Sequence, residues 1–317
     1  MAFYYGSYDW DSILATIRDD LAGYDEWEVY DEQVANGICL KDLRTNKYLC
    51  VRKRVLIVYR YSSYDQYGAG IQASISTDWD SNNHLPSGTV KSVFGTLAGP
   101  DLGNNSTNSF QSYANTYFND YMGSDDSYTV AMWTDKAGFA LAVVNPFSYN
   151  PSSLYRTISF FMNVEFIPDG KKEFDDGLGN FYLVATRCDM GLISFENSGI
   201  DRAHIYARDT AFETAQSLGY CKHERGAIRS LGSGKVYFEF PYYYNETQLR
   251  TLSAQSKRWF LVAKDMGLAV GDIISWIDPD AGLTRKFFVA EVAATGSAAN
   301  SGNFLVAIPY ENADDYS

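Results

Sequence analysis

Short runs rich in β-branched and aromatic residues recur along most of this chain, separated by polar or glycine-bearing turns. One is VLIVYRY at 55–61, and two others, 128–134 and 139–145, flank a DKAG turn that is typical of a hairpin. Such residues fit a pleated, half-buried surface, so a chain patterned in this way pairs its strands into sheets. The sequence predicts an α+β fold that is mostly β, with antiparallel sheets.

One segment near the N-terminus departs from this pattern, because its apolar residues recur at helical spacing. Asp9 or Asp11 is available to cap the start of this segment, and Gly23 to end it. The spacing predicts an N-terminal amphipathic helix, packed on an apolar core and followed by the sheets. Its apolar residues are Trp10, Ile13, Leu14, Ile17 and Leu21.

The length of 317 residues predicts two domains or one large one. We place a boundary near 195, between an N-terminal domain (1–194) and a C-terminal module (195–317). The first contains a long polar insertion at about 78–126, and the second is predicted to be a small β-barrel or sandwich, since its short strands recur at near-regular spacing. In the second, PYYYNETQ is interpreted as a loop that leads into a short helix.

Charge and hydropathy exclude some classes of function. The net charge of −13 argues against nucleic-acid binding, which requires a dense set of Lys and Arg side chains. No stretch approaches the roughly 18 consecutive apolar residues of a membrane span. The opening MAFYYGSYDWDS lacks the features of a secretory signal, so we expect a protein made and folded in a cytosol.

The four cysteines are too sparse for a disulfide scaffold. If Thr45 and Asn46 form the turn of a hairpin, Cys50 lies opposite Lys41, and Cys39 is then a diagonal neighbour at roughly 7–8 Å. That separation is too long for a disulfide without a register shift, so free buried thiols are expected.

No residue is nominated as catalytic, cofactor-binding or metal-ligating. The segment DWDSNN at 78–83 has the first spacings of a calcium-binding loop, but it lacks the glycine and the bidentate glutamate of that motif. We interpret it as a solvated turn. The alternative is a looser calcium site on the surface. Adjacent acidic pairs, such as Asp19-Asp20, Asp125-Asp126 and Asp175-Asp176, do not identify the two carboxylates of a glycoside hydrolase, because neighbours on a strand point to opposite faces.

Tyrosine is unusually abundant, with 25 in the chain, and many of these residues lie in or beside polar, loop-like sequence. Tyrosine buries a large area at low entropic cost and keeps a polar tip, which suits protein interfaces and sugar-stacking surfaces. The sequence predicts an extensive contact surface. Its candidate interface residues are Tyr61, Tyr64, Tyr67, Tyr113, Tyr117, Tyr121, Tyr242, Tyr243 and Tyr244.

Three parts of the chain resemble structural proteins of tailed bacteriophages. They are the helix pattern from Trp10 to Leu21 followed by Trp27, the hairpin AMWTDKAGFALAVVNP, and the closing sequence GDIISWID…RKFFVAEV…FLVAIPYE. The resemblance implies a virion component of the tail, baseplate or neck, which is made in the host cytoplasm and binds copies of itself and other virion proteins. It implies no functional residues, and the tract from Asp78 to Asp126 has no counterpart in it.

The leading hypothesis is therefore a non-enzymatic structural protein of a tailed phage that assembles through aromatic-rich interfaces. The first alternative is a carbohydrate-binding or receptor-recognition module, in which the same tyrosines stack on host-surface glycans. The second is a glycan-degrading enzyme. A structural protein is expected to have its tyrosine-rich segments covered by neighbouring chains, whereas a carbohydrate-binding module is expected to bind glycans as an isolated chain.

Overall fold

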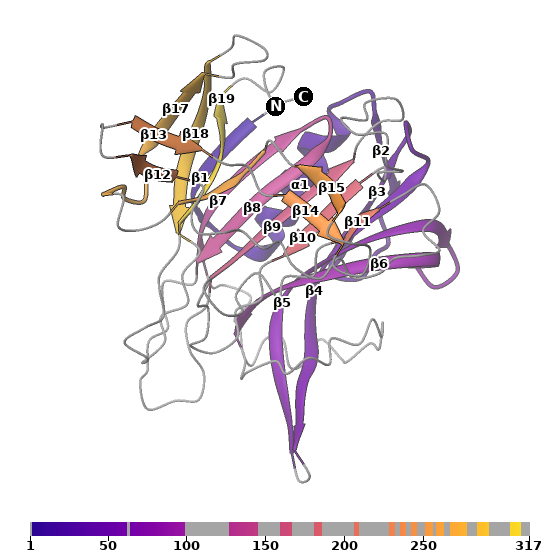
Figure 1. Cartoon of the computed structure of the whole chain (residues 1–317). Coiled ribbons are helices and arrows are strands. Elements are labelled where there is room, and N and C mark those ends of the chain that lie inside the picture. The colour runs from indigo at the N-terminus through magenta and orange to yellow at the C-terminus, as the bar shows by residue number, and fades with distance from the viewer. Residues whose placement is uncertain are drawn as a thin grey trace.

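The computed structural model describes residues 2–61, 64–98, 127–144, 159–166, 181–185, 206–208, 228–231, 235–238, 242–245, 251–255, 258–262, 267–277, 284–291 and 305–311. The described residues form one helix and a series of strands (Figure 1). Their bounds are β1 (Ala2–Tyr8), α1 (Trp10–Ala22), β2 (Trp27–Asp31), β3 (Gly37–Asp42), β4 (Lys47–Tyr61), β5 (Tyr64–Asp80), β6 (Leu85–Ala98), β7 (Tyr128–Asp135), β8 (Gly138–Val144), β9 (Ser159–Phe166), β10 (Phe181–Ala185), β11 (Tyr206–Arg208), β12 (Ile228–Leu231), β13 (Lys235–Phe238), β14 (Tyr242–Asn245), β15 (Thr251–Gln255), β16 (Phe260–Val262), β17 (Ile273–Ile277), β18 (Thr284–Glu291) and β19 (Leu305–Glu311).

The mostly-β class predicted from the sequence is confirmed, and the described strand pairs are antiparallel. The three larger sheets have the orders β1-β7-β8-β9-β10-β11, β2-β3-β4-β5-β6 and β16-β19-β18-β17. Two further pairs, β12-β13 and β14-β15, form two-stranded sheets. Within the described parts of the chain, no helix combines the length and the apolarity needed to cross a membrane.

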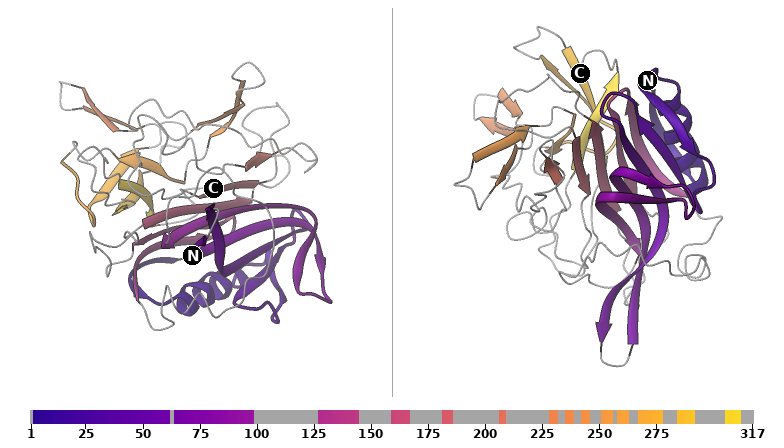
Figure 2. Two further views of the ribbon diagram at one scale, coloured as in Figure 1. Left: turned by 90° about the horizontal axis from the view of Figure 1, so that it is seen from below. Right: turned by 90° about the vertical axis from the view of Figure 1, so that its right-hand side faces the viewer.

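The six-stranded sheet is the middle layer, because both of its faces are covered (Figure 2). Along β7, Val130 and Met132 join the main core with α1 and the five-stranded sheet, whereas Ala131 and Trp133, which alternate with them, are buried on the opposite face. Phe161 of β9 also lies on that opposite face and contacts Trp259, with ring centroids 4.9 Å apart. The C-terminal four-stranded sheet follows Trp259 and covers this side.

Helix α1 forms where the sequence places an acidic cap before an apolar stripe. The Asp9 side chain accepts a hydrogen bond from Ser12 N–H at 2.7 Å, and the helix ends at Gly23. A carboxylate that accepts such a bond satisfies one of the free N–H groups of the first turn. The buried residues of the helix are Trp10, Ile13, Leu14, Ile17 and Leu21, which are the residues of the sequence pattern.

The hairpin β7–β8 turns through Lys136 and Ala137, as the DKAG sequence predicts. The Asp135 carboxylate accepts bonds from Ala137 N–H and Gly138 N–H at 2.8 and 3.1 Å. Gly138 has φ +143°, and a Cβ there would lie 2.2 Å from the Val164 carbonyl oxygen. Only glycine lets β9 approach this turn so closely.

Several strands differ from those that the sequence predicts. Strand β1 was not predicted, and it adds an edge to the six-stranded sheet through β7. The run predicted as a strand at 55–61 is the second half of a longer strand, β4, and part of the polar insertion forms β6. The loop interpretation of PYYYNETQ is wrong for Tyr242–Asn245, because β14 pairs with β15 there. The predicted boundary near 195 and the short helix after Asn245 lie outside the described residues.

The predicted pairing around the first two cysteines is also wrong. Cys50 lies opposite Cys39, not Lys41, because the hairpin loop has four residues, Leu43 to Asn46, instead of two. The Asp42 carboxylate closes this loop by accepting bonds from Thr45 N–H and the Arg44 side chain. Both cysteines are free and buried, as expected, and burial raises the pKa of the Cys39 thiol.

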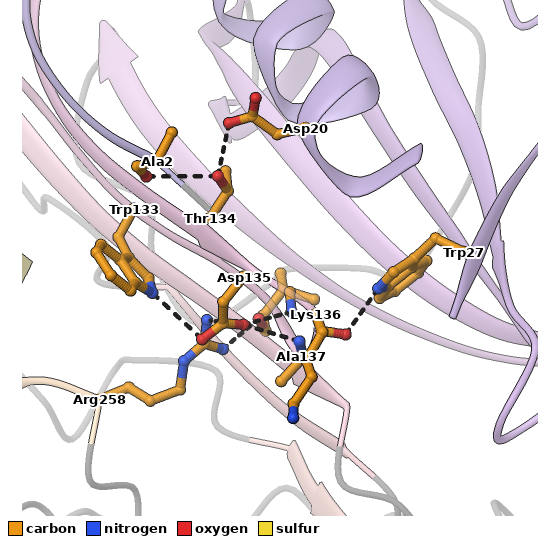
Figure 3. Close-up of polar contacts among 11 residues, drawn as sticks. Ala2, Asp20, Trp27, Trp133, Thr134, Asp135, Lys136, Ala137 and Arg258 are labelled. Atoms are coloured by element: carbon orange, nitrogen blue, oxygen red, sulfur yellow. Dashed lines mark hydrogen bonds and ion pairs between the residues drawn. The ribbon is translucent and has the colours of Figure 1, made fainter. Parts of the chain in front are cut away.

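A buried ion pair fastens the start of the C-terminal sheet to the middle layer (Figure 3). The Arg258 guanidinium donates to Asp135 Oδ1 at 2.8 Å and to the Val164 carbonyl at 3.2 Å. Trp133 Nε1 donates to the other carboxylate oxygen at 3.2 Å. The side chains of Arg258 and Asp135 are 1% and 5% exposed. The pair thus joins two segments that lie 123 residues apart, and neither charge reaches water.

Removing one member of this pair leaves the other charge buried without its partner. Arg258→Met should lower the free energy of unfolding by about 3–5 kcal/mol, measured by urea unfolding. The double variant Asp135→Asn/Arg258→Met should recover most of that loss, because an asparagine oxygen still accepts from the turn N–H groups and carries no charge. Arg18→Met, which removes a surface pair with Asp19, is the control and should change stability by less than about 0.5 kcal/mol. An Arg258→Met protein as stable as this control would contradict the account.

Candidate assembly interface

Strands β4 and β5 extend beyond the body of the protein as a two-stranded ribbon (Figure 1). We call residues 54–61 and 64–68 the arm. The two strands pair along this whole length, from Arg54 opposite Gly70 to Tyr61 opposite Tyr64 at the tip. In the second view of Figure 2, the arm again points away from the sheets.

The arm begins where the neighbouring strands stop. On one side, β3 pairs with β4 only as far as Gly37 opposite Arg52, and Lys53 N–H donates to the Asn36 carbonyl at 2.8 Å. On the other side, β6 pairs with β5 only from Ala69 onward. Beyond these points, no other described strand pairs with the arm, so both of its backbone edges lack a described partner.

The root of the arm is fixed to the core. Val51 and Ile71 are fully buried in the main core cluster, directly below the arm. Lys53 Nζ lies 2.6 Å from Asp11 Oδ1 in the first turn of α1, and Asp9 caps the same turn. The hydrogen bond from Ser12 N–H holds the pKa of Asp9 below its ordinary value, against the opposing effect of burial. The arm therefore projects from a fixed base.

The sequence of the arm is apolar for a segment that leaves the body. The run 55–59 (VLIVY) has no charge, and Arg54 and Arg60 flank it. The register places Ile57 opposite Tyr67, and a bulge follows between Ile57 and Tyr59. A two-stranded ribbon is marginally stable in water by itself, and an uncharged β-rich run on a free edge is a pairing surface. This arrangement suits a contact with another polypeptide.

The structure places some of the predicted interface tyrosines. Tyr61, Tyr64 and Tyr67 belong to the strands of the arm. Tyr242, Tyr243 and Tyr244 belong to β14, which has a bulge between the last two. The predicted residues Tyr113, Tyr117 and Tyr121 lie outside the described residues. The sequence predicted a strand at 55–61, but it did not predict the partner strand at 64–68 or the arm that the two strands form.

The calcium-like segment 78–83 was predicted to be a turn, but its first three residues are the end of strand β5, and only the residues from 81 onward lie in the turn that leads to β6. The Asp80 carboxylate accepts from Asn82 N–H at 2.9 Å and from Asn83 Nδ2 at 2.6 Å, so it is engaged within the turn. Among the described residues, no group of three or more His, Cys, Asp or Glu side chains is placed to hold a metal ion.

Next to this turn, Asp31 holds a small polar cluster. Its Oδ2 atom accepts from Trp79 Nε1 at 2.7 Å and contacts His84 Nδ1 at 2.8 Å, and Gln33 N–H donates to Oδ1 at 2.8 Å. Burial alone would raise the pKa of Asp31, but these hydrogen bonds outweigh it and hold the pKa below its ordinary value. The cluster ties β2 to the end of the β5–β6 hairpin.

Of the three acidic pairs, only Asp19-Asp20 lies in the described residues. Asp20 has a structural role, because its carboxylate accepts from Thr134 Oγ1 at 2.6 Å (Figure 3). The same carboxylate accepts from the Tyr4 hydroxyl at 2.9 Å. Burial, and to a lesser extent the hydrogen bond to Asp20, raises the pKa of Tyr4 to about 12. These bonds join α1 to β1 and β7.

No family model, no curated protein and no solved structure matches this chain.

The Asp31 cluster predicts a specific loss of stability in acid. Because the folded pKa of Asp31 is depressed, its contribution is present above the ordinary pKa of an aspartate, about 3.9, and is lost as the pH falls through the folded pKa. Asp31→Asn should lower the free energy of unfolding by about 1–2 kcal/mol at neutral pH and by less in acid. Urea unfolding at about pH 7 and about pH 3 measures this. Asp25→Asn, at an exposed site, is the control, and an equal loss for Asp31→Asn at both pH values would contradict the assignment.

Proposed function

We propose that this chain is a non-enzymatic structural protein of a tailed bacteriophage, and that it assembles in the tail, baseplate or neck by binding copies of itself and neighbouring virion proteins. The observation that carries the proposal is the arm. A protein that acts alone gains nothing from an apolar ribbon held away from its core, whereas a protein that assembles gains a contact surface.

The geometry of the arm supports this proposal in three ways. The ribbon is anchored, since its root continues the strands that carry Val51 and Ile71 in the core. Both edges of the ribbon lack a described partner strand, and a strand from another chain would complete its backbone hydrogen bonds. The predicted interface residues Tyr61, Tyr64 and Tyr67 lie on it. Tyrosine is enriched at protein interfaces, where its ring is covered and its hydroxyl stays paired.

The organisation of the C-terminal part belongs to the same proposal. We regard 195–317 as a small β-barrel or sandwich module, of which the sheet β16-β19-β18-β17 is one part. The resemblance of its closing sequence to virion proteins supports this interpretation. In this view the Asp135–Arg258 pair holds the module at a fixed angle to the arm-bearing domain, so that a particle can be built from identical copies.

Incorporation into particles tests the proposal. Ile57→Asp places a charge in the apolar run of the arm, and a buried interface charge without a partner costs enough to weaken binding by about tenfold or more. We expect the wild-type chain in purified particles by quantitative mass spectrometry, and the Ile57→Asp chain to be depleted about tenfold. The control is Leu43→Asp, which puts the same charge at an exposed leucine outside the arm and should incorporate as the wild type does.

A chain that is absent from particles altogether would overturn the proposal. The alternative, a carbohydrate-binding or receptor-recognition module, predicts that the isolated chain binds glycans and loses that binding when Tyr242, Tyr243 and Tyr244 are replaced by Ala. A glycan-degrading enzyme would release reducing ends from host polysaccharide. We expect neither result from the isolated chain.

A further inference from the structure

A pocket of about 270 Å³ opens between the six-stranded sheet and the C-terminal sheet. Three alanines from three strands line it, namely Ala131 of β7, Ala142 of β8 and Ala290 of β18. Val144, Val270, Thr129 and Tyr5 of β1 complete the lining, and the exposed side chains of Tyr5 and Val270 mark its mouth. The pocket exists because these positions carry small side chains, whereas Trp133 and Phe161 fill the same layer elsewhere.

The lining of the pocket favours an apolar occupant. Space left between small apolar side chains forfeits the dispersion contacts that a packed core would gain, and an inserted apolar side chain restores them. The mouth is exposed, with Tyr5 and Val270 at 48% and 40% exposure. A side chain that belongs to another molecule can therefore enter.

The mouth continues into an exposed apolar surface. Ile273, at 42% exposure, lies opposite Phe288 in the β17–β18 pair, and the Phe288 ring lies 4.7 Å from the ring of Tyr5. Exposed apolar side chains that adjoin one another and a pocket are typical of an interaction site. We call the pocket and these three exposed residues, Tyr5, Val270 and Ile273, the receiving site.

Strand edges lie beside the receiving site. Strand β1 is the end strand of its sheet and β17 is the end strand of the C-terminal sheet, so each has one edge with no described partner strand. Proteins often block the addition of a strand to a sheet edge with a charged residue or a proline. The seven residues of β1 (AFYYGSY) include neither. An incoming strand can thus form backbone hydrogen bonds at the same place where its side chains enter the pocket.

We propose that the arm of a second copy of this chain occupies the receiving site. The arm presents what the site lacks, an apolar run on a ribbon whose edges have no partner among the described strands. Charge also favours this partner. Residues 54–68, which span the arm, hold two basic residues and one acidic residue, a formal charge of +1, whereas the rest of the chain has a formal charge of −14. A basic arm is attracted to the acidic body of another copy. This inference rests on the proposed function, since it names the partner of the arm.

The proposal fixes the symmetry of the contact. The arm projects from the body, so it does not reach the receiving site of its own chain (Figure 1). The two halves of the contact are different surfaces, and such a contact is heterologous. Head-to-tail contacts of this kind produce a closed ring where the rotation closes and a filament where it does not.

Two complementary variants test the contact. In the armless variant, residues 55–69 are replaced by Asn-Gly, a two-residue hairpin turn between Arg54 and Gly70, which are paired in β4 and β5. In the blocked variant, Val270→Arg puts a bulky cation at the mouth of the pocket, where it repels the arginines that flank the apolar run. Leu43→Arg is the matched control, because it makes the same change at an exposed residue outside the receiving site. Circular dichroism verifies that each variant is folded.

Sedimentation velocity measures the masses of the species that each variant forms. We expect the wild type and Leu43→Arg to grow from monomers into larger species as concentration rises, and each of the other two variants to associate at least about tenfold more weakly. When the two variants are mixed, the armless variant supplies the receiving site and the blocked variant supplies the arm. The mixture should form a one-to-one heterodimer that grows no further.

Three results would overturn this inference. They are a mixture that forms no heterodimer, a blocked variant that associates as well as the wild type, and a wild type that stays monomeric at every concentration. None of these results shows whether the chain is found in particles. The proposed function is therefore tested separately, by mass spectrometry of particles.

Discussion

The fold depends on a middle sheet that is apolar on both faces. Successive residues of β7, β8 and β9 are buried whichever way they point, so this sheet is stable only between two covering layers. One cover is α1 with the five-stranded sheet, and the other begins at Arg258 and Trp259. Since both covers are obligatory, the C-terminal sheet is part of the body, and the Asp135–Arg258 pair determines where its chain enters. The arm stands outside this arrangement, because its two strands pair with each other and with no other described strand.

The sequence predicts the parts of the fold that depend on local spacing. The helix pattern from Trp10 to Leu21 and the DKAG turn need only neighbouring residues to be interpreted, and the structure has α1 and the β7–β8 hairpin there. Pairing between strands that lie far apart in the chain is harder to predict from the sequence. Strand β1 was missed because a short aromatic segment becomes a strand only when β7 lies beside it. The Cys39–Cys50 register was missed because Asp42 closes a four-residue loop with its side chain.

The candidate interface was partly predictable, for similar reasons. Tyrosines among polar residues indicated a contact surface, and residues 55–61 indicated a strand. That this strand leaves the body is decided by where β3 and β6 stop pairing with its neighbours, which depends on the whole sheet. The receiving site was invisible in the sequence, because it depends on three alanines that come together only after two sheets pack. The contact surface itself stays a prediction from tyrosine abundance, and the structure adds that Tyr61, Tyr64 and Tyr67 lie on the arm.

The central claim is that the arm is a contact between chains, and hydrogen–deuterium exchange measures this directly. The outer backbone edge of residues 54–61 has no described partner strand in the isolated chain, and an amide without a hydrogen bond exchanges rapidly. The account predicts rapid exchange of these outward-facing amides in the dilute monomer and strong protection of the same amides in the assembled protein, while the amides of β8, in the middle of its sheet, are protected in both. Equal exchange of the arm in the two states would contradict the account.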